Sequence, residues 1–254
     1  MTSSVFASDR FARSLFFPGP DPSRPPPGAD DRWLEVDGAR LRVRVHHGER
    51  ARLLVCFPGN GEHAGSYDDL ADRFTALAGG IAVAFCEYRG YGQSTGTPTY
   101  PDLIADARRL VAWLAADRPA GAVALYGRSL GSQAALHALD AAAAPPAALI
   151  IDSGFSDLDA FVARRGLGSV HIGDRDRARY QVLARARAFA GPLLVVHGEA
   201  DEVIDPDDGA ALASGPAAGP RRLVRVPGHG HNDLFAAPAH GRALDEFLRQ
   251  VWPA

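Results

Sequence analysis

The most informative absence in this 254-residue sequence is lysine, because every one of its 27 basic residues is an arginine. Without a lysine amine the chain cannot form a Schiff base with a carbonyl substrate or with pyridoxal phosphate. The phosphate-binding lysine of a Walker loop is excluded for the same reason. The sequence also lacks any stretch approaching the roughly 18 consecutive apolar residues of a membrane-spanning helix. These absences exclude Schiff-base and pyridoxal enzymes, proteins with a Walker-loop lysine, and a membrane-spanning helix.

Cysteine is scarce as well, since only Cys56 and Cys86 are present. Both lie in apolar runs, so we expect buried, reduced thiols rather than a disulfide framework or a zinc site. The net charge of −3 predicts no strong attraction to nucleic acid or anionic lipid. Residues 1–19 lack the apolar core of a signal peptide. We therefore expect a cytoplasmic protein without a stable membrane anchor; nothing indicates its oligomeric state.

Residues 1–30 are expected to form an N-terminal segment that precedes the main domain. Phe11, Leu15 and Phe16 could line one face of a short helix, which we expect to pack onto the domain. Contact with a membrane surface is the alternative, although one short helix of low charge binds lipid weakly. Residues 18–30 contain too many prolines for a helix or a central strand and are predicted to be an extended connector.

Apolar strands alternate with amphipathic helices over residues 31–254, a pattern typical of a parallel sheet with helices on both faces. Asp37–Gly38 is a turn pair that predicts an opening hairpin. The sequence thus predicts an α/β fold with an eight-stranded, mostly parallel sheet whose first pair is antiparallel. The expected strands cover residues 33–36, 40–47, 53–57, 81–88, 122–126, 147–152, 192–197 and 222–226.

Helices are expected where apolar residues recur every three or four positions. Only residues 154–191 interrupt the alternation, and we interpret them as a small helical cap inserted into the domain. The expected helices cover residues 66–78, 101–116, 130–141 and 240–251.

One segment carries the strongest chemical signal. Gly127–Arg128–Ser129–Leu130–Gly131 follows an apolar strand and opens an alanine-rich helix. It matches G-x-S-x-G, the sharp strand-to-helix turn that exposes a serine hydroxyl. The glycines avoid clashes in the tight turn, and the helix start directs N–H groups at a reacting carbonyl. We predict that Ser129 is a nucleophile rather than part of a merely structural turn.

A serine hydroxyl is a poor nucleophile without a base. The loop after the last predicted strand offers two histidines, His229 and His231. We favour His231 because it lies further into the loop and precedes Asn232 and Asp233, which can cap the next helical turn. His229 is the alternative.

The third member of such a site is an acid that orients the histidine and stabilises its protonated form. Asp201 is our candidate, because it follows the penultimate predicted strand. Asp205 and Asp152 are the alternatives. The order along the chain, Ser129 before Asp201 before His231, is the order expected for a fold with this serine elbow.

Two backbone N–H groups are needed to bind the oxyanion of the reaction. The first is predicted to be that of Leu130, directly after the nucleophile. The second should come from the loop after the third strand, where we choose Asn60 and keep Gly61 as the alternative. Glycines on either side of Asn60 allow the backbone to approach the substrate oxygen closely.

Five stretches carry a resemblance to a known superfamily: PGNGEHAGSYDDLA, EYRGYGQSTGTP, YGRSLGS, LLVVHGEADEVI and PGHGHND. The chain resembles the α/β-hydrolases, in particular the Bem46-type and serine aminopeptidase S33-type bacterial hydrolases. GEHAGSY is also similar to monoacylglycerol lipases, but the cap here is shorter than theirs. The resemblance implies Ser129, Asp201 and His231 as the catalytic triad, with Asn60 and Leu130 at the oxyanion hole.

One residue departs from the family pattern. Pro58 stands before Gly59, where family members usually carry a histidine, so the supporting hydrogen bonds of that histidine are lost while the backbone donor after Gly59 remains. We expect a serine hydrolase that cleaves a carboxylic ester, or a thioester or amide, of a small-molecule acyl substrate. No cofactor and no metal are expected.

Other interpretations use the same residues. Acyl transfer or C–C bond cleavage would keep the triad, and a ligand-binding protein of this fold would use no chemistry. His229, His231 and Asp233 also imitate an H-x-H-x-D metal cluster, but Leu234 stands where a dinuclear site would want histidine.

The predicted cap holds seven arginines and four aspartates. We expect the arginines to pair with acids on a solvated face; the sharper hypothesis is that some point into the cleft and select anionic substrates.

Overall fold

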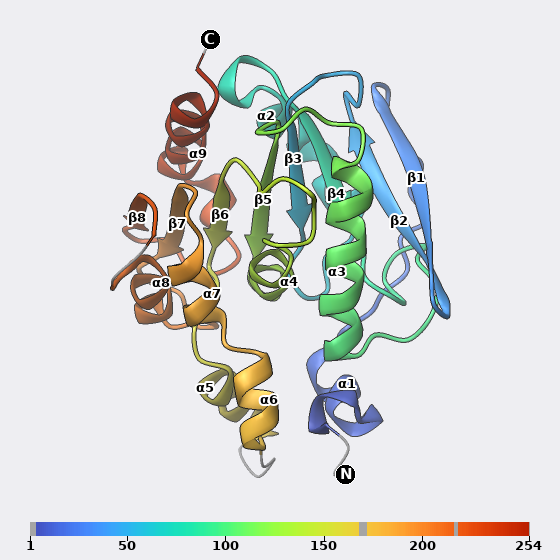
Figure 1. The fold of residues 1–254 in the computed structure, drawn as a ribbon, viewed down its shortest axis with the longest axis vertical. Coiled ribbons are helices and arrows are strands. Elements are labelled where there is room, and N and C mark those ends of the chain that lie inside the picture. Colours follow the sequence, from blue (N-terminus) through green and yellow to red (C-terminus); the bar gives the residue numbers. More distant parts are fainter. Residues whose placement is uncertain (1–3, 168–171, 216–217, 254) are drawn as a thin grey trace.

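The computed structural model describes residues 4–167, 172–215 and 218–253 (Figure 1). Its centre is an eight-stranded sheet in the order β1-β2-β4-β3-β5-β6-β7-β8. β2 pairs antiparallel with both β1 and β4, and the remaining pairings are parallel. The predicted eight-stranded, mostly parallel α/β architecture is therefore confirmed. The strands are β1 (Ala29–Val36), β2 (Ala39–His46), β3 (Leu53–Phe57), β4 (Ala82–Cys86), β5 (Val123–Arg128), β6 (Leu149–Asp152), β7 (Leu193–Gly198) and β8 (Arg221–Val226).

Helices cover both faces of the sheet, because strands that are apolar throughout cannot leave either face in water. α3 and α4 pack on one face together with the N-terminal segment, while α2 and α9 pack on the other. The α-helices are α1 (Asp9–Leu15), α2 (Ala71–Thr75), α3 (Tyr100–Ala115), α4 (Gly131–His137), α5 (Leu158–Val162), α6 (Asp174–Arg179), α7 (Val182–Ala188), α8 (Pro206–Ala213) and α9 (Pro238–Val251). The shorter turns are η1 (Val5–Ala7), η2 (Ala64–Leu70), η3 (Leu77–Gly79), the π-helical η4 (Ala163–Leu167) and η5 (Leu234–Ala236).

The helix predicted over residues 66–78 is wrong in detail. The chain is 3₁₀-helical over η2 and α-helical only over α2, and Ala78 then adopts a positive φ of 50°. Tyr67 and Phe74 nevertheless face the core, where Tyr67 stacks on Phe85 with 4.5 Å between ring centroids. Packing of these rings overrides helical propensity. The helix predicted to reach residue 141 also ends early, at His137 of α4.

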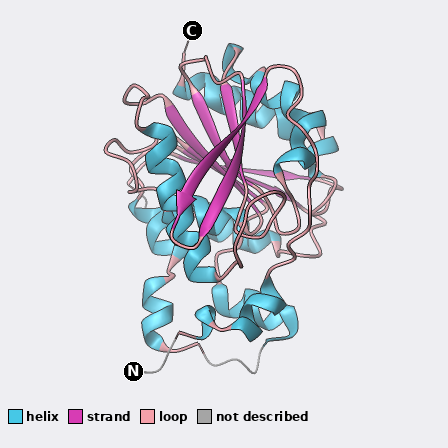
Figure 2. Cartoon of the chain, turned by 90° about the vertical axis from the view of Figure 1, so that its right-hand side faces the viewer, coloured by secondary structure: helices cyan, strands magenta, loops and turns pink. Residues whose placement is uncertain are grey.

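A layer of short helices lies beyond the carboxyl ends of the parallel strands (Figure 2). α5, η4, α6 and α7 come from residues 154–191, of which 168–171 lie outside the described residues. α1 comes from the N-terminal segment and contacts η4. Phe11, Leu15 and Phe16 are buried in the core, so this segment packs onto the domain as expected.

The proline-rich connector is fastened to the sheet by a buried ion cluster. Arg42 of β2 is fully buried and pairs with Asp21 of the connector and with Glu87, the latter at 2.5 Å. Asp21 also accepts the Gly65 N–H at 3.0 Å. These charge-assisted hydrogen bonds hold the connector in one place between α1 and β1.

Acidification is expected to destabilise the fold through His137, which is buried and whose Nε2 has no partner among the described residues. Burial, followed by the charges of Arg185 and Arg108, lowers the pKa of His137 to about 3. The unfolded chain takes up this proton near pH 6.5, so the stability held by the neutral ring is lost as the pH falls below that value. Between pH 7 and pH 5 this group should remove about 2 kcal/mol from the free energy of unfolding. Urea denaturation measures it: the loss should shrink by that amount in His137→Leu, and an equal loss in both proteins would contradict the assignment.

Candidate active site

Ser129 stands at the turn between β5 and α4, with the positive φ of 49° that marks a strained elbow. Its N–H donates to the carbonyl oxygen of Asp152 at 2.9 Å. A Cβ atom on Gly127 would overlap the backbone of Gly131, and one on Gly131 would overlap the carbonyl oxygen of Phe57. Close backbone packing therefore requires both glycines of the motif.

His231, in the loop after β8, meets Ser129 at the carboxyl edge of the sheet. Its Nε2 lies 3.0 Å from Ser129 Oγ and its Nδ1 lies 2.8 Å from Asp201 Oδ2. A carboxylate only accepts hydrogen bonds, so Nδ1 carries the proton and Nε2 presents its lone pair to the serine hydroxyl. All three residues are buried, with exposed fractions of 4% for Ser129 and 8% for the other two.

Asp201 is held ionised in the loop after β7. Its Oδ1 accepts the N–H groups of Val203 and Ile204 at 2.9 and 2.8 Å. Burial opposes its ionisation, but hydrogen bonds from His197, His231 and the Ile204 amide outweigh burial and hold the pKa of this carboxyl well below its usual range. The carboxylate is therefore fixed in both charge and direction.

The alternative residues have other partners. His229 Nδ1 lies 3.0 Å from the carbonyl oxygen of Pro227, and Asp205 caps α8. The Asp152 carboxylate accepts the Tyr126 hydroxyl at 2.5 Å and lies 2.7 Å from His240 Nε2.

One argument that favoured His231 is wrong. Asp233 stands at the N-cap position of η5 without a side-chain cap, and its carboxylate instead accepts the Gly230 N–H at 2.7 Å.

The two predicted oxyanion donors lie on adjoining turns. Gly131 packs so closely on Phe57 and Pro58 that the start of α4 abuts the loop after β3. In the part of the chain that the structure describes, neither the Asn60 nor the Leu130 N–H donates to a protein acceptor. Both amides therefore remain candidates, as predicted; Gly61, the alternative, is their neighbour.

This loop is held without the histidine that Pro58 replaces. The Tyr88 hydroxyl donates to the Pro58 carbonyl oxygen at 2.6 Å. Glu62 Oε2 accepts the Gly59 N–H and the Tyr67 hydroxyl, each at 2.5 Å. These bonds hold the loop after β3 in place.

Arg128, the residue before Ser129 in the motif, is buried and makes contacts that the sequence analysis did not predict. It is only 4% exposed, pairs with Glu62, and donates to the carbonyl oxygen of His231 at 2.8 Å. One guanidinium thus bridges the loop after β3 and the loop that carries the histidine. The sequence already indicated such contacts, because an arginine that the fold buries next to the nucleophile needs a charged partner.

Arg128→Met is expected to lower both stability and turnover. It leaves the Glu62 carboxylate without its cation, and breaking a buried pair costs about 3 kcal/mol or more. The double variant Glu62→Gln, Arg128→Met removes the unpaired charge, so it should regain stability but not turnover. Urea midpoints and kcat for the unaltered protein, the single variant and the double variant test this. Recovery of turnover together with stability would show that Arg128 acts only on the fold.

His197, at the end of β7, is a second residue whose role was missed. Its fully buried ring places Nε2 3.2 Å from Asp201 Oδ2 and 3.2 Å from the carbonyl oxygen of Ile204. Since both partners accept, Nε2 carries the proton. Asp201 therefore receives hydrogen bonds from His231 and from His197, which lies only four residues before it in the chain. The sequence analysis considered only His231 as its partner.

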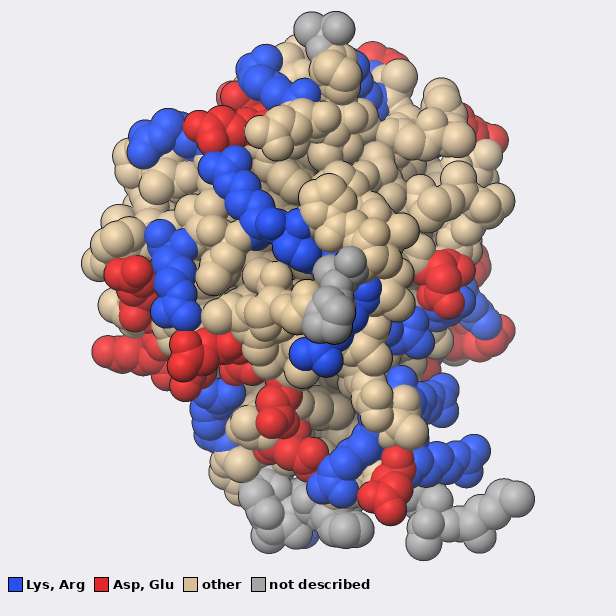
Figure 3. Space-filling model, turned by 60° about the vertical axis from the view of Figure 1, so that its left-hand side comes forward, with Lys and Arg blue, Asp and Glu red and all other residues tan. Residues whose placement is uncertain are grey.

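Arginines of the cap pair with aspartates. Arg177 donates to Asp159 at 2.9 and 3.0 Å, and Arg164 donates to Asp208 at 2.8 Å. Figure 3 shows basic and acidic side chains interspersed over this end of the molecule. These pairs favour the expectation that the cap arginines pair with acids on a solvated face. The side chain of Arg165 lies outside the described residues.

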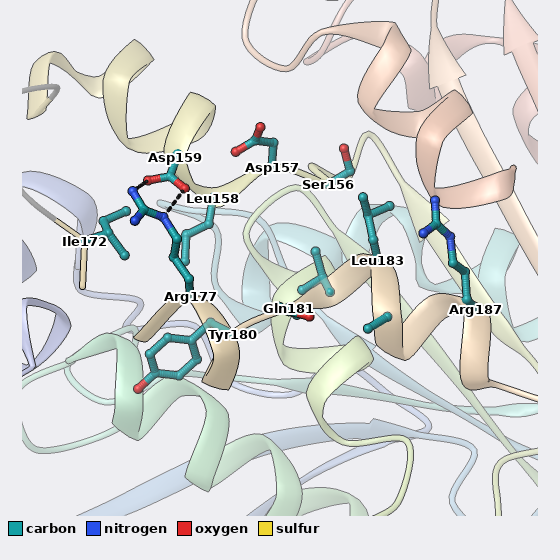
Figure 4. Close-up of a pocket in the computed structure, with 12 residues that line it drawn as sticks. Ser156, Asp157, Leu158, Asp159, Ile172, Arg177, Tyr180, Gln181, Leu183 and Arg187 are labelled. Carbon is teal, nitrogen blue, oxygen red and sulfur yellow. Dashed lines mark hydrogen bonds and ion pairs between the residues drawn. The ribbon is translucent and has the colours of Figure 1, made fainter. Parts of the chain in front are cut away.

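A separate pocket of about 390 Å³ lies within the cap, between α5, α6 and α7 (Figure 4). Arg177 and Arg187 stand at its two sides, with the apolar Leu158 and Ile172 between α5 and α6. Its described lining includes none of Ser129, Asp201 and His231.

His229, His231 and Asp233, whose spacing in the sequence imitates a metal-binding motif, do not form a metal-binding cluster in the structure. His229 and Asp233 face Pro227 and Gly230, and no group of three His, Cys, Asp or Glu side chains suits a metal ion among the described residues. Cys56 and Cys86 are free and buried, as predicted. Within the described ranges, no helix has the length and apolarity needed to cross a membrane.

Comparisons with known proteins agree with this architecture. Residues 48–171 match the family model of serine aminopeptidase S33. An uncharacterised protein of Mycobacterium tuberculosis, Rv2307c, is 34% identical over 90% of this chain and 83% of its own length. The chain belongs to the α/β-hydrolase superfamily.

Further relatives of this α/β-hydrolase carry named activities. The lysophosphatidylserine lipase ABHD12 of Macaca fascicularis is 28% identical over 89% of this chain and 61% of its own length. The Pyrococcus furiosus esterase Pf2001 superposes with a TM-score of 0.70, covering 92% of this chain and 98% of its own at 17% identity. The latter likeness concerns the fold alone.

Proposed function

We propose that this α/β-hydrolase is a serine hydrolase that cleaves a carboxylic ester through an acyl-enzyme. The observation that carries the proposal is the hydrogen-bonded series from Ser129 Oγ through His231 to Asp201, with distances of 3.0 and 2.8 Å. The named activity of the lipase relative supports the same reaction class. The substrate is a small acyl compound, and thioesters or amides are open to the same chemistry.

Acylation begins when Ser129 Oγ attacks the carbonyl carbon while His231 Nε2 takes the hydroxyl proton. The carbonyl electron pair moves onto oxygen, which accepts hydrogen bonds from the Asn60 and Leu130 amides. Collapse of this tetrahedral species expels the alcohol, which takes the proton back from His231. Asp201 keeps Nδ1 of the ring protonated throughout and stabilises the imidazolium.

Deacylation repeats the sequence with water. His231 removes a proton from the water as its oxygen attacks the acyl carbon, and the same two amides hold the second oxyanion. Ser129 then leaves with the proton from His231, and the carboxylic acid is released. No step requires a cofactor, since the protein supplies the nucleophile, the base and the charge stabilisation.

The proposal is tested with a fluorophosphonate probe and a series of p-nitrophenyl esters from acetate to dodecanoate. We expect stoichiometric labelling of Ser129, located by mass spectrometry, and turnover that varies with chain length. Labelling without turnover of any ester would indicate another reaction on the same residues, such as acyl transfer. Absence of labelling would contradict the proposal and favour a ligand-binding protein.

A further inference from the structure

The side chain of Asn60 is bound by the N-terminal segment. Its Nδ2 donates to the carbonyl oxygen of Leu15 at 2.5 Å. Its Oδ1 accepts the N–H of Phe17 at 3.1 Å, and the same N–H is shared with the Tyr91 hydroxyl oxygen at 2.9 Å. Tyr91 completes the arrangement, since its hydroxyl donates to the same Oδ1 at 2.6 Å. The carboxamide therefore pairs with backbone atoms two residues apart, as a neighbouring strand would, and caps the end of α1.

The other end of the same segment contacts the cap. Phe6 is fully buried and packs edge-on against Tyr180, which follows α6, with 5.2 Å between ring centroids. Ser4 Oγ donates to Asp176 Oδ2 of α6 at 2.9 Å. Residues 4–17 therefore run from the cap to the loop that holds the predicted oxyanion donor.

We propose that the N-terminal segment is a positioning element of the active site, which sets the Asn60 amide through the Asn60 side chain. This inference rests on the proposed function. The physical reason is the composition of the loop: Asn60 lies between two glycines, and Gly61 adopts a positive φ of 82°. Such backbone is intrinsically permissive, so side-chain bonds must fix the direction of the amide.

The position matters because the amide acts only within about 3 Å of the developing oxyanion. Removing one such donor from a hydrolase costs about 10²–10³-fold in kcat. Glu62 holds the Gly59 side of the loop, whereas the segment holds Asn60 itself. Displacing the segment should therefore affect turnover more than ground-state binding of the ester.

Two pairs of proteins test the proposal. Asn60→Asp keeps the size of the side chain but replaces the donor to Leu15 with an oxygen. Phe17→Pro removes the backbone N–H, and Phe17→Ala is its matched control, because both lose the ring and only proline lacks the donor. We expect kcat to fall about 10–100-fold in Asn60→Asp relative to the unaltered protein and in Phe17→Pro relative to Phe17→Ala, with KM changed less than threefold.

A trifluoromethyl ketone supplies a readout that a merely structural role would not move. Ser129 adds to its carbonyl to give a tetrahedral oxyanion, so its Ki should rise in proportion to the loss of kcat. If Asn60→Asp does not fold, the comparison of Phe17→Pro with Phe17→Ala carries the test alone. Unchanged kcat and Ki in Phe17→Pro against Phe17→Ala, even with a lower melting temperature, would overturn the proposal. Failure of the proposed function is distinguishable, because the unaltered protein would then neither react with the fluorophosphonate nor hydrolyse esters.

Discussion

Ser129→Ala is expected to reduce ester turnover about a millionfold while leaving the fold intact. The hydroxyl supplies the nucleophile, and neither His231 nor the two amides can replace the covalent step. Removing the oxygen costs little stability, since Oγ bonds only the His231 ring among the described residues. The measurement is kcat for the best p-nitrophenyl ester, with circular dichroism to check the fold.

Ser153→Ala is the matched control. Ser153 lies after the neighbouring strand β6, has a φ of 48°, and is buried with no hydrogen-bond partner for Oγ among the described residues. Ser153→Ala places an alanine at nearly the same positive φ as Ser129→Ala does, but it removes no residue of the proposed reaction. If Ser129→Ala kept even a tenth of the activity, Ser129 would not be the nucleophile.

His231→Ala should be nearly as damaging as the serine change, with a loss of about 10⁵–10⁶ in kcat, because the two residues act as one unit. Without the ring, Ser129 Oγ has no acceptor for its proton, and the charge of Asp201 faces no cation during the reaction. Fluorophosphonate labelling should slow in parallel, since it needs the same activated oxygen.

His229→Ala distinguishes the two histidines of the loop. His229 is directed at the carbonyl oxygen of Pro227, so its loss should reduce kcat by less than about tenfold, within the range of an indirect effect on the loop. An inactive His229 variant beside an active His231 variant would show that the base is wrongly assigned.

The sequence predicted the sheet for a physical reason, and the three residues that it singled out as a candidate triad lie together in the structure. Parallel strands buried on both faces must be apolar throughout, and a serine elbow needs glycines at fixed positions. Residues that follow successive strands then meet at the carboxyl edge, so Ser129, Asp201 and His231 could be chosen from their places along the chain.

What could not be predicted depends on contacts between residues far apart in sequence. The break in the helix over residues 66–78 follows from the packing of Tyr67 on Phe85, which periodicity does not contain. The bridge from Arg128 to Glu62 and His231 joins three segments. The attachment of Asn60 to Leu15 is likewise invisible, because one partner is a backbone atom of any residue type.

The burial of Arg42 has a consequence for how the protein responds to salt. Ion pairs on the surface, such as Arg249 with Asp245, weaken as ionic strength rises, because mobile ions screen them within a few ångströms. Arg42 is fully buried, so ions cannot enter between it and Asp21. The ion pair between Arg42 and Asp21 should therefore persist in molar salt and keep the connector attached to the sheet. Residues 4–17, which precede the connector, should then stay packed beside Asn60.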